Sequence, residues 1–184
     1  DGYITSIPLE ELVIVVANST WSAMQSASKI IIKTENGNPD LNNESIKIRL
    51  QKDSKLEGIQ AGNTVGNVEE GFASSSRILE HEYELSIQAQ AAMEPLTATA
   101  NVTENHCEFW GPIQVQDLPV MVATQVTGLT PDKIKVNTTF HGGGFGRKSE
   151  ADYVVPPIVA SKVLGKPVQI TWSREEDIRS GFYR

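Results

Sequence analysis

The sequence contains a single cysteine, lacks any long apolar run and has no excess of positive charge. Because one cysteine cannot close an internal disulfide, we expect Cys107 to be a small apolar residue of the core. No apolar run approaches the roughly 18 residues that a membrane-spanning helix requires, so no membrane insertion is expected. The formal net charge of -7 argues against nucleic acid as a partner over a broad surface, and any anion site must therefore be local.

The remaining composition is that of a soluble globular protein, with 39% hydrophobic and 21% charged residues in a chain of 184. This length suits one ordinary domain or two small ones and is sufficient to bury a core. No signal peptide is recognisable, and the chain opens with Asp1 rather than Met, close to an expected strand. We therefore expect it to be a piece of a longer protein.

The N-terminal part predicts a strand, a helix and a second strand. An apolar run at residues 11–17 precedes Ser19 and Thr20, either of which can cap a helix, and a short apolar run at Ile30–Ile32 follows that helix. The next stretch is rich in Asn, Gly, Asp and Lys. It is expected to be a connector made largely of loops, with one strand at Ile46–Leu50.

A new unit is expected to begin at Asn67. Asn67 followed three residues later by Glu70 resembles a capping box, which predicts a helix start. Val68, Phe72 and Leu79 are spaced roughly as the buried face of that helix requires.

The C-terminal half alternates strand and helix patterns. The expected elements are a strand at 81–87, two strands within 96–112 around the turn 103–106, a helix at 116–128 with Pro119 in its first turn and Gly128 at its stop, a strand at 133–140, a helix from near Asp152 to Gly165, and a strand at 167–173. The mixture of hairpin and strand–helix–strand units predicts the α+β class.

Residues 142–146 read Gly-Gly-Gly-Phe-Gly and are followed at once by Arg147 and Lys148. Between a strand and a helix, such a loop presents backbone N–H groups with a helix dipole behind them, and it allows a bulky group to contact the main chain. Arg147 offers a planar fork for phosphate and Lys148 a point charge. The pattern is neither the dinucleotide fingerprint nor a Walker loop. It predicts a site for another anionic cofactor, or else a turn that only reverses the chain.

Several short segments in a fixed order carry a resemblance to a known family. They lie at 91–100, 110–114, 142–148, 152–155, 165–177 and 181–184. Together they resemble the molybdenum-binding subunit of the xanthine dehydrogenase family of molybdenum hydroxylases, and most closely the branch of the isoquinoline 1-oxidoreductase β subunit and related aldehyde dehydrogenases. The resemblance extends from about Asn67 to Arg184, and residues 13–35 resemble the end of that family's α/β-hammerhead segment. It implies that residues 1–60 are the end of this segment with a connector, and that residues 61–184 are the first part of a molybdopterin-binding domain.

The resemblance implies a molybdopterin cofactor with molybdenum, in bacteria of this branch usually as the cytosine dinucleotide. The loop residues that would contact it are Gly142, Gly143, Gly144, Phe145 and Gly146. Phe145 would lie beside the molybdenum pocket. Arg147 would either reach the phosphates of the cofactor or pair with a neighbouring acid.

Two further residues take roles from the resemblance. Gln114 matches a glutamine that donates a hydrogen bond to an oxygen on molybdenum, and an amide can do so without binding the metal. Its alternative is an amide that makes local hydrogen bonds at a helix entry. Glu94 lies in a segment that resembles the substrate-side wall, and its alternative is a solvated turn residue. No side chain is expected to bind the metal directly.

The chain departs from its relatives at two places. Gln90 and Ala92 stand where many relatives carry a histidine and a proline, which removes any proton transfer at position 90. Ser149 stands where several relatives place an acid, with Glu150 one residue later.

The two tryptophans near the site are expected to be structural, and the three histidines to be surface or loop residues. Trp110 and Trp172 are interpreted as core aromatics. His81, His106 and His141 show no spacing typical of metal ligands.

The reaction implied by the resemblance is hydroxylation of an N-heterocycle or oxidation of an aldehyde, with water as the oxygen source. Because the chain has no cysteine pattern for iron–sulfur clusters, electrons are expected to leave through another subunit or segment. The resemblance implies a partner subunit with two 2Fe–2S clusters. The family's general-base glutamate lies beyond Arg184, so the isolated chain is expected to be cofactor-free and inactive.

Two other functions stay open. One is an anion- or nucleotide-binding module without redox chemistry, and the other is a non-catalytic paralogue that keeps the fold, to which Gln90 gives some weight. The location, periplasmic or cytoplasmic, also stays open.

Overall fold

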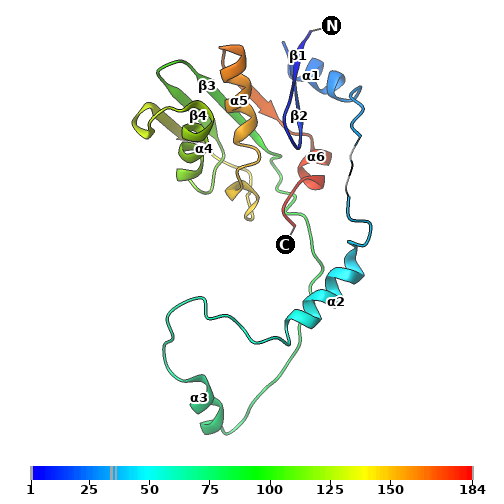
Figure 1. Ribbon diagram of the computed structural model, residues 1–184, viewed down its shortest axis with the longest axis vertical. Coiled ribbons are helices and arrows are strands. Elements are labelled where there is room, and N and C mark those ends of the chain that lie inside the picture. The colour runs from blue at the N-terminus through cyan, green and yellow to red at the C-terminus, as the bar shows by residue number, and fades with distance from the viewer. Residues whose placement is uncertain (1, 34, 36, 184) are drawn as a thin grey trace. The chain divides into compact units, whose positions relative to one another are not determined.

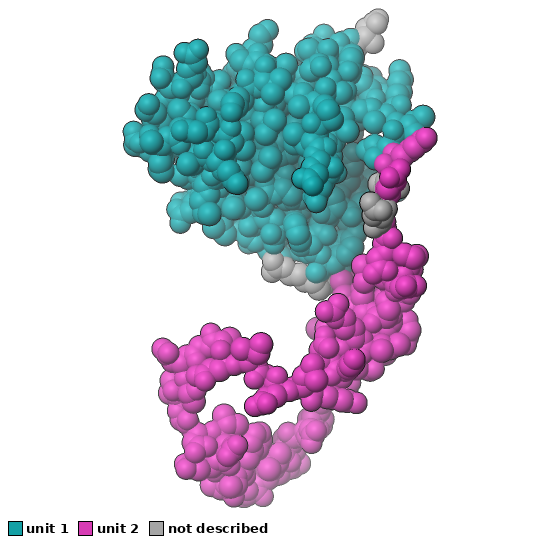
Figure 2. Space-filling view, viewed as in Figure 1, with its two compact units in different colours: residues 1–32, 88–184 teal, residues 33–87 magenta. Residues whose placement is uncertain are grey.

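The computed structural model describes residues 2–33, 35 and 37–183 and separates them into two compact units. Unit 1 combines the described residues of 1–32 with those of 88–184, and unit 2 covers 33–87 (Figure 2). Each unit is described by itself. No helix in the described ranges is long and apolar enough to cross a membrane.

Unit 1 contains a four-stranded sheet in the order β5-β4-β3-β6. Figure 1 labels its two middle strands, β4 and β3. The central strand β3 (Thr97–Val102) pairs antiparallel with β4 (Cys107–Gly111) and with β6 (Val168–Thr171). By contrast, β4 pairs in parallel with β5 (Ile134–Thr138). The two strands predicted around the turn 103–106, and the later two strands, are thereby confirmed.

Three helices belong to this sheet. Helix α4 (Asp117–Thr127) and a short 3-10 turn, η1 (Pro131–Lys133), connect the parallel strands β4 and β5. Helix α5 (Val155–Leu164) precedes β6, and helix α6 (Arg174–Arg179) follows β6. α4 packs on α5, and α5 packs on β3 and β6.

Both long helices stop where the sequence predicts. α4 is capped by Gly128 with φ 79°, and α5 by Gly165 with φ 62°. These left-handed conformations favour glycine because it lacks a Cβ atom.

The main core lies between the sheet and the two long helices. Every second residue of β3 and β4 is buried, as expected for a sheet with one covered face. Cys107 is fully buried in this core, which confirms its expected role. Trp172 packs against the core while partly exposed, and Trp110 is half-buried. The other buried members include Leu96, Phe109, Ile113, Val122, Tyr153 and Ile158.

The N-terminal strands form a hairpin that belongs to unit 1. β1 (Tyr3–Pro8) and β2 (Val13–Ala17) are antiparallel, and α1 (Thr20–Ala27) follows with Ser19 as its N-cap. A second apolar cluster joins this hairpin to Ala160 of α5 and to apolar residues of β6. The predicted first strand and helix are confirmed.

The strand predicted at Ile30–Ile32 is wrong. These residues form no regular element, and the side chains of Ile31 and Ile32 are largely exposed. A short β-branched run becomes a strand only where a neighbouring strand is available, and the described residues provide none for it.

Unit 2 contains two helices, α2 (Asn43–Asp53) and α3 (Val68–Ser74), and none of its described residues is buried. The strand predicted at Ile46–Leu50 is wrong because these residues lie within α2. Asn42 and Ser45 form a reciprocal capping box at the start of this helix. The cap explains the outcome, since it satisfies the first N–H groups of a helix.

The prediction that a helix begins at Asn67 is confirmed, because its side chain accepts a hydrogen bond from the Glu70 N–H. The predicted buried face of that helix is wrong, since Val68 and Phe72 are exposed. The strand predicted at 81–87 is also wrong, because no regular element forms there.

Candidate functional site

Four strand ends meet at one edge of the sheet of unit 1. β4 and β5 run in parallel with Gly111 opposite Thr138, and the Thr139 N–H donates to the Gly111 carbonyl at 3.1 Å. The carboxyl ends of parallel strands open at the same edge. Gln114, which follows β4, is therefore brought to the glycine loop at 142–146, which follows β5.

The same edge receives the start of β3 and the end of β6. These strands are antiparallel with Thr97 opposite Thr171, and the Trp172 N–H donates to the Leu96 carbonyl at 2.9 Å. Glu94, which lies just before β3, and α6, which follows β6, therefore reach the loop from the other two strands.

The glycine loop uses three positive φ angles. Gly143 has φ 91° and Gly146 has φ 88°, which glycine adopts without steric cost. Phe145 has φ 51°, which is uncommon for a residue with a side chain, and the residue is 70% exposed. Such a conformation persists where neighbouring contacts fix it, and it is frequent at ligand sites.

The helix expected directly behind the loop is absent. The loop passes into a 3-10 turn, η2 (Arg147–Ser149), and α5 begins at Val155 rather than near Asp152. Pro156 and Pro157 occupy its first turn, where an N–H has no acceptor to lose. The predicted contribution of a helix dipole to the loop stays a prediction, and the N–H groups nearest to an anion at the loop are those of the loop itself.

The bare backbone of the loop makes room for side chains of this same chain. A Cβ atom built on Gly142 would lie 2.9 Å from the Glu94 Cβ. One built on Gly144 would lie 2.4 Å from the Gln114 Oε1, and Gly144 has no positive φ that would require glycine. The glycines at these two positions are thus needed for the approach of Glu94 and Gln114.

Gln114 holds the C-terminal end of the loop. Its Oε1 accepts hydrogen bonds from the Gly146 N–H at 3.1 Å and from the Lys148 N–H at 3.2 Å, and its own backbone N–H donates to the Lys148 carbonyl at 3.0 Å. Two backbone donors fix which end of the amide is oxygen. The Nε2 donor is left without an acceptor in the described ranges, and the residue is exposed.

Glu94 contacts both ends of the loop. Its Oε2 accepts a hydrogen bond from the Lys148 Nζ at 2.6 Å and one from the Gly142 N–H at 3.0 Å. The Glu94 N–H donates to the Gly142 carbonyl at 3.2 Å. Partial burial raises the pKa of Glu94, but the hydrogen bonds from Lys148 and Gly142 lower it further, so the net pKa is below its ordinary value.

Arg147 is buried beneath the loop, with 2% of its surface exposed. Its two terminal nitrogens donate to the two Asp152 carboxylate oxygens at 2.8 and 2.6 Å, and its Nε lies 3.4 Å from the Asp177 Oδ1. The guanidinium also lies over the rings of Trp172 and Phe182. Of the two alternatives for Arg147, the structure shows the ion pair with a neighbouring acid, not a side chain free to reach a phosphate.

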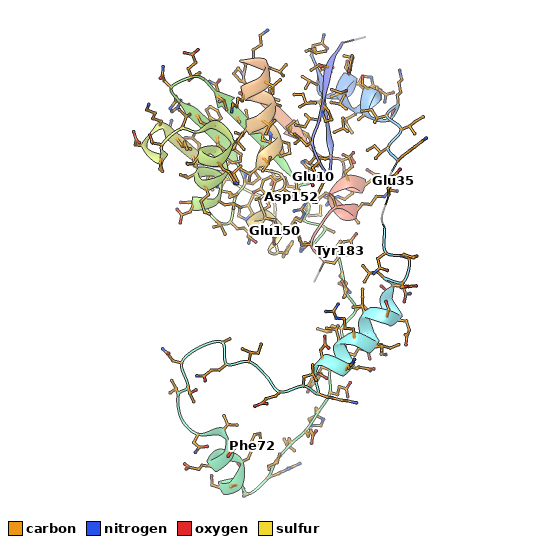
Figure 3. All side chains as sticks on the ribbon, in the orientation of Figure 1. Glu10, Glu35, Phe72, Glu150, Asp152 and Tyr183 are labelled. Carbon is orange, nitrogen blue, oxygen red and sulfur yellow. The ribbon has the colours of Figure 1, made fainter. Side chains whose placement is uncertain are left out.

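The partners of Arg147 were not identified from the sequence. Asp152, labelled in Figure 3, lies in the segment between η2 and α5. Asp152 lies five residues beyond Arg147, whereas side chains that pair on a helix are three or four residues apart, and Asp177 comes from the end of a different strand.

The remaining candidates are placed as follows. Gln90 donates from Nε2 to the Phe182 carbonyl at 2.6 Å, so it holds the C-terminal segment. His81 and His141 are exposed and His106 is half-buried, and all three lie outside helices and strands, as expected for surface or loop residues. The described residues contain no group of three or more His, Cys, Asp or Glu side chains that could hold a metal ion.

The loop also presents donors without partners. In the described part of the chain, the N–H groups of Gly143, Gly144 and Phe145 have no acceptor, whereas those of Gly142 and Gly146 are used by Glu94 and Gln114. Three successive free N–H groups beside the Gln114 amide form a set of hydrogen-bond donors that suits oxygen atoms carrying negative charge.

Comparison with known proteins supports a specific ligand class. Residues 51–184 match the family described as "Molybdopterin cofactor-binding domain". Isoquinoline 1-oxidoreductase subunit beta of Brevundimonas diminuta is 31% identical over 109 residues, which cover 59% of this chain and 14% of that protein. A protein of Gluconacetobacter polyoxogenes named membrane-bound aldehyde dehydrogenase (pyrroloquinoline-quinone) is 29% identical over 132 residues, 71% of this chain and 17% of its own length.

A solved structure shows the same fold. Aldehyde oxidoreductase from Desulfovibrio gigas aligns with a TM-score of 0.65 over 92% of this chain and 19% of its own, at 19% identity. At that identity the likeness concerns the fold alone. The chain spans about a sixth of the length of the two curated relatives.

Proposed function

Because this chain belongs to the molybdopterin cofactor-binding domains of the molybdenum hydroxylase family, we propose that its glycine loop contacts such a cofactor in a molybdenum-dependent oxidoreductase. In this proposal residues 61–184 are the first part of the cofactor-binding domain, and residues 1–60 are the end of an α/β-hammerhead segment with a connector. The substrate is an aldehyde or an N-heterocycle, as the names of the relatives suggest.

The observation that carries the proposal is the set of free donors at the strand ends. The N–H groups of Gly143, Gly144 and Phe145 and the Nε2 of Gln114 have no acceptor in the described ranges. Adjacent N–H donors of this kind suit an oxygen-rich group, whereas the space beside Gly142 and Gly144 is taken by Glu94 and Gln114. The residues therefore fit the oxygen-rich periphery of a molybdopterin.

Gln114 and Phe145 have different roles in this proposal. Gln114 donates from Nε2 to an oxygen of the bound group, because its Oε1 is held by Gly146 and Lys148. The exposed ring of Phe145 lies beside the pocket and orients a planar substrate. When bound, the cofactor supplies the two-electron oxidation with water as the oxygen source, and electrons pass to an iron–sulfur subunit. The cytosine dinucleotide form is part of the proposal.

Arg147 supports the site without contacting the phosphates. Its terminal nitrogens are both committed to Asp152, and it is almost fully buried. A phosphate contact would require breaking this bidentate ion pair.

The test uses a protein that contains this chain and is as long as the curated relatives. It is produced together with its iron–sulfur partner. We expect about one molybdenum and one pterin per chain. Gln114→Ala should lower kcat by about a hundredfold, the cost of losing one donor to a developing charge. Gln116→Ala, an exposed residue in the same segment, is the matched control. A product that holds no molybdenum in the presence of its partner would overturn the proposal and favour a non-catalytic paralogue.

The free N–H groups also favour a second candidate, an anion- or nucleotide-binding module without redox chemistry. This candidate requires that a nucleotide or inorganic phosphate raise the thermal unfolding midpoint of the chain itself. Stabilisation by phosphate together with absence of molybdenum would select it.

A further inference from the structure

We propose that Glu94 and Lys148 act as a positioning pair that fixes the glycine loop for the cofactor, and that Glu94 is not a proton-transfer residue of the substrate wall. This inference rests on the proposed function. It assigns Glu94 a contact with the loop where the sequence suggested a contact with substrate. Neither residue touches the bound group in this assignment.

The geometry of the pair joins the two ends of the loop. One oxygen of Glu94 accepts from the N–H of Gly142, the first glycine, and from the Nζ of Lys148, two residues beyond the last glycine. The main chain adds a hydrogen bond from the Glu94 N–H to the Gly142 carbonyl. A loop whose two ends meet on one carboxylate oxygen has little freedom to open.

The burial of Lys148 shows that its charge serves this pair. Its side chain is 0% exposed, whereas the Glu94 side chain is 34% exposed. A fully buried ammonium requires a charged partner, because the interior cannot solvate it. Lys148 therefore cannot also present its charge to an anion at the surface of the loop.

The same contacts argue against proton transfer by Glu94. The oxygen that faces the loop is occupied by two donors, and these donors keep the carboxylate ionised at neutral pH by lowering its pKa. A general acid or a general base at neutral pH works best with a pKa near 7, so a carboxylate held below its ordinary pKa suits neither role.

The loop needs such a constraint because it has few other means of order. Three successive glycines lose more conformational entropy on folding than any other residues would, and Phe145 sits at a strained φ of 51°. On the facing segment, Ala91 is strained as well, with φ 42°. Both strained residues lie within three positions of the Glu94–Lys148 pair, which holds their two segments together.

The experiment compares three variants: Glu94→Ala, Lys148→Met and the double variant. The first removes the partner of a buried ammonium, and the double variant removes that ammonium as well. We expect Glu94→Ala to increase hydrogen exchange at the amides of Gly142 and Lys148 by about tenfold or more, and the double variant to exchange more slowly than Glu94→Ala. Lys135→Met, which breaks the exposed Lys135–Glu108 pair, should leave these amides unchanged.

The second readout is the molybdenum content of the longer protein that contains this chain. Glu94→Ala should lower molybdenum per chain, and the added Lys148→Met should restore part of it. Unchanged exchange at both loop amides in Glu94→Ala would overturn the inference. So would a loss of kcat at full molybdenum content that the second substitution does not relieve, because that outcome assigns Glu94 to catalysis.

The two proposals fail separately. If the unmodified protein holds no molybdenum, the proposed function fails, while hydrogen exchange still decides whether the pair fixes the loop. If Glu94→Ala does not fold, a folded double variant supports the inference, and a double variant that also does not fold contradicts it.

Discussion

At the scale of single residues, the glycine loop shows that a missing side chain can be required by a neighbour rather than by a backbone angle. Gly143 and Gly146 have positive φ angles, but Gly144 does not. At Gly144 the reason is space, because the Gln114 amide occupies the volume that a Cβ would take. The distinction matters for substitutions, since a steric requirement can be relieved only if Gln114 moves away.

We therefore expect Gly144→Ala to lower the free energy of unfolding by about 1–3 kcal/mol, the usual cost of inserting a methyl group into a packed site. The added carbon would lie 2.4 Å from the Gln114 Oε1, closer than atoms tolerate. Chemical denaturation of the purified chain measures the change. Gly62→Ala is the control, since no atom lies within 4 Å of the position that its added Cβ would take. Equal stability of both variants would contradict the close contact.

The carboxylate of Glu94 predicts a dependence on pH. A group whose pKa is lowered in the folded state stabilises the fold above its unfolded pKa of about 4.3, and this contribution is lost as the pH falls through the folded pKa. We expect Glu94→Gln to lower the unfolding midpoint at pH 7 and to have a smaller effect near pH 3. Glu104→Gln, at an exposed turn position, should change neither value. A difference that grows as the pH falls would show that the sign is wrong.

At the scale of secondary-structure elements, prediction succeeded where local pattern and tertiary environment agree. The alternation in β3 and β4 is reproduced by burial on one face, and the glycines after α4 and α5 end those helices as expected. These signals depend on side chains within the element itself. They are therefore readable from one sequence.

Prediction failed where a strand had no partner. Residues 46–50 alternate apolar and charged side chains as an exposed strand would, yet they form part of α2. The capping box at Asn42 and Ser45 supplies a local reason for a helix, whereas a strand needs a second strand to satisfy its backbone. The same reasoning applies to 81–87, where no described strand lies alongside.

An ion pair joins α6 to Arg147, the residue that follows the glycine loop, and this contact predicts how firmly α6 is held. Arg147 Nε lies 3.4 Å from the Oδ1 of Asp177, and Asp177 is 5% exposed. Arg147→Met removes the charge beneath a buried carboxylate, so we expect the amides of α6 to exchange faster by about tenfold. Arg179→Met, at the exposed end of the same helix, is the control. Unchanged exchange in α6 would mean that Arg174, which also pairs with Asp177, is sufficient to hold it.

At the scale of the whole molecule, the candidate site is a product of topology. Glu94, Gln114 and the loop at 142–146 come from three strand ends, and the parallel pairing of β4 and β5 brings the last two together. The sequence supplied the residues through a family resemblance. It could not supply their mutual contacts, since a pairing such as Glu94 with Lys148 spans 54 positions and leaves no local pattern. For the same reason Asp177 was missed, whereas Asp152 lies only five residues from Arg147, a separation typical of neither helix nor strand neighbours.

The two units differ in how many of their side chains are buried. This difference predicts where a protease cleaves the chain. Unit 1 contains two apolar clusters, whereas no described residue of unit 2 is buried, even though it carries Leu41, Ile59 and Phe72. Segments with few buried contacts open at low free energy, and proteases cut opened segments first.

We therefore expect brief trypsin treatment to cut the chain between residues 33 and 87 before any site in β3 to β6. Exposed cations are present in that segment at Arg49, Lys55 and Arg77, whereas Lys148 of unit 1 is fully buried. Mass spectrometry of the early products identifies the sites. Because the β1–β2 hairpin packs on α5, the N-terminal piece should stay bound to the C-terminal piece after cleavage and co-elute with it in gel filtration. Early cleavage at 133, 135 or 148, or separation of the two pieces, would contradict this division of the chain.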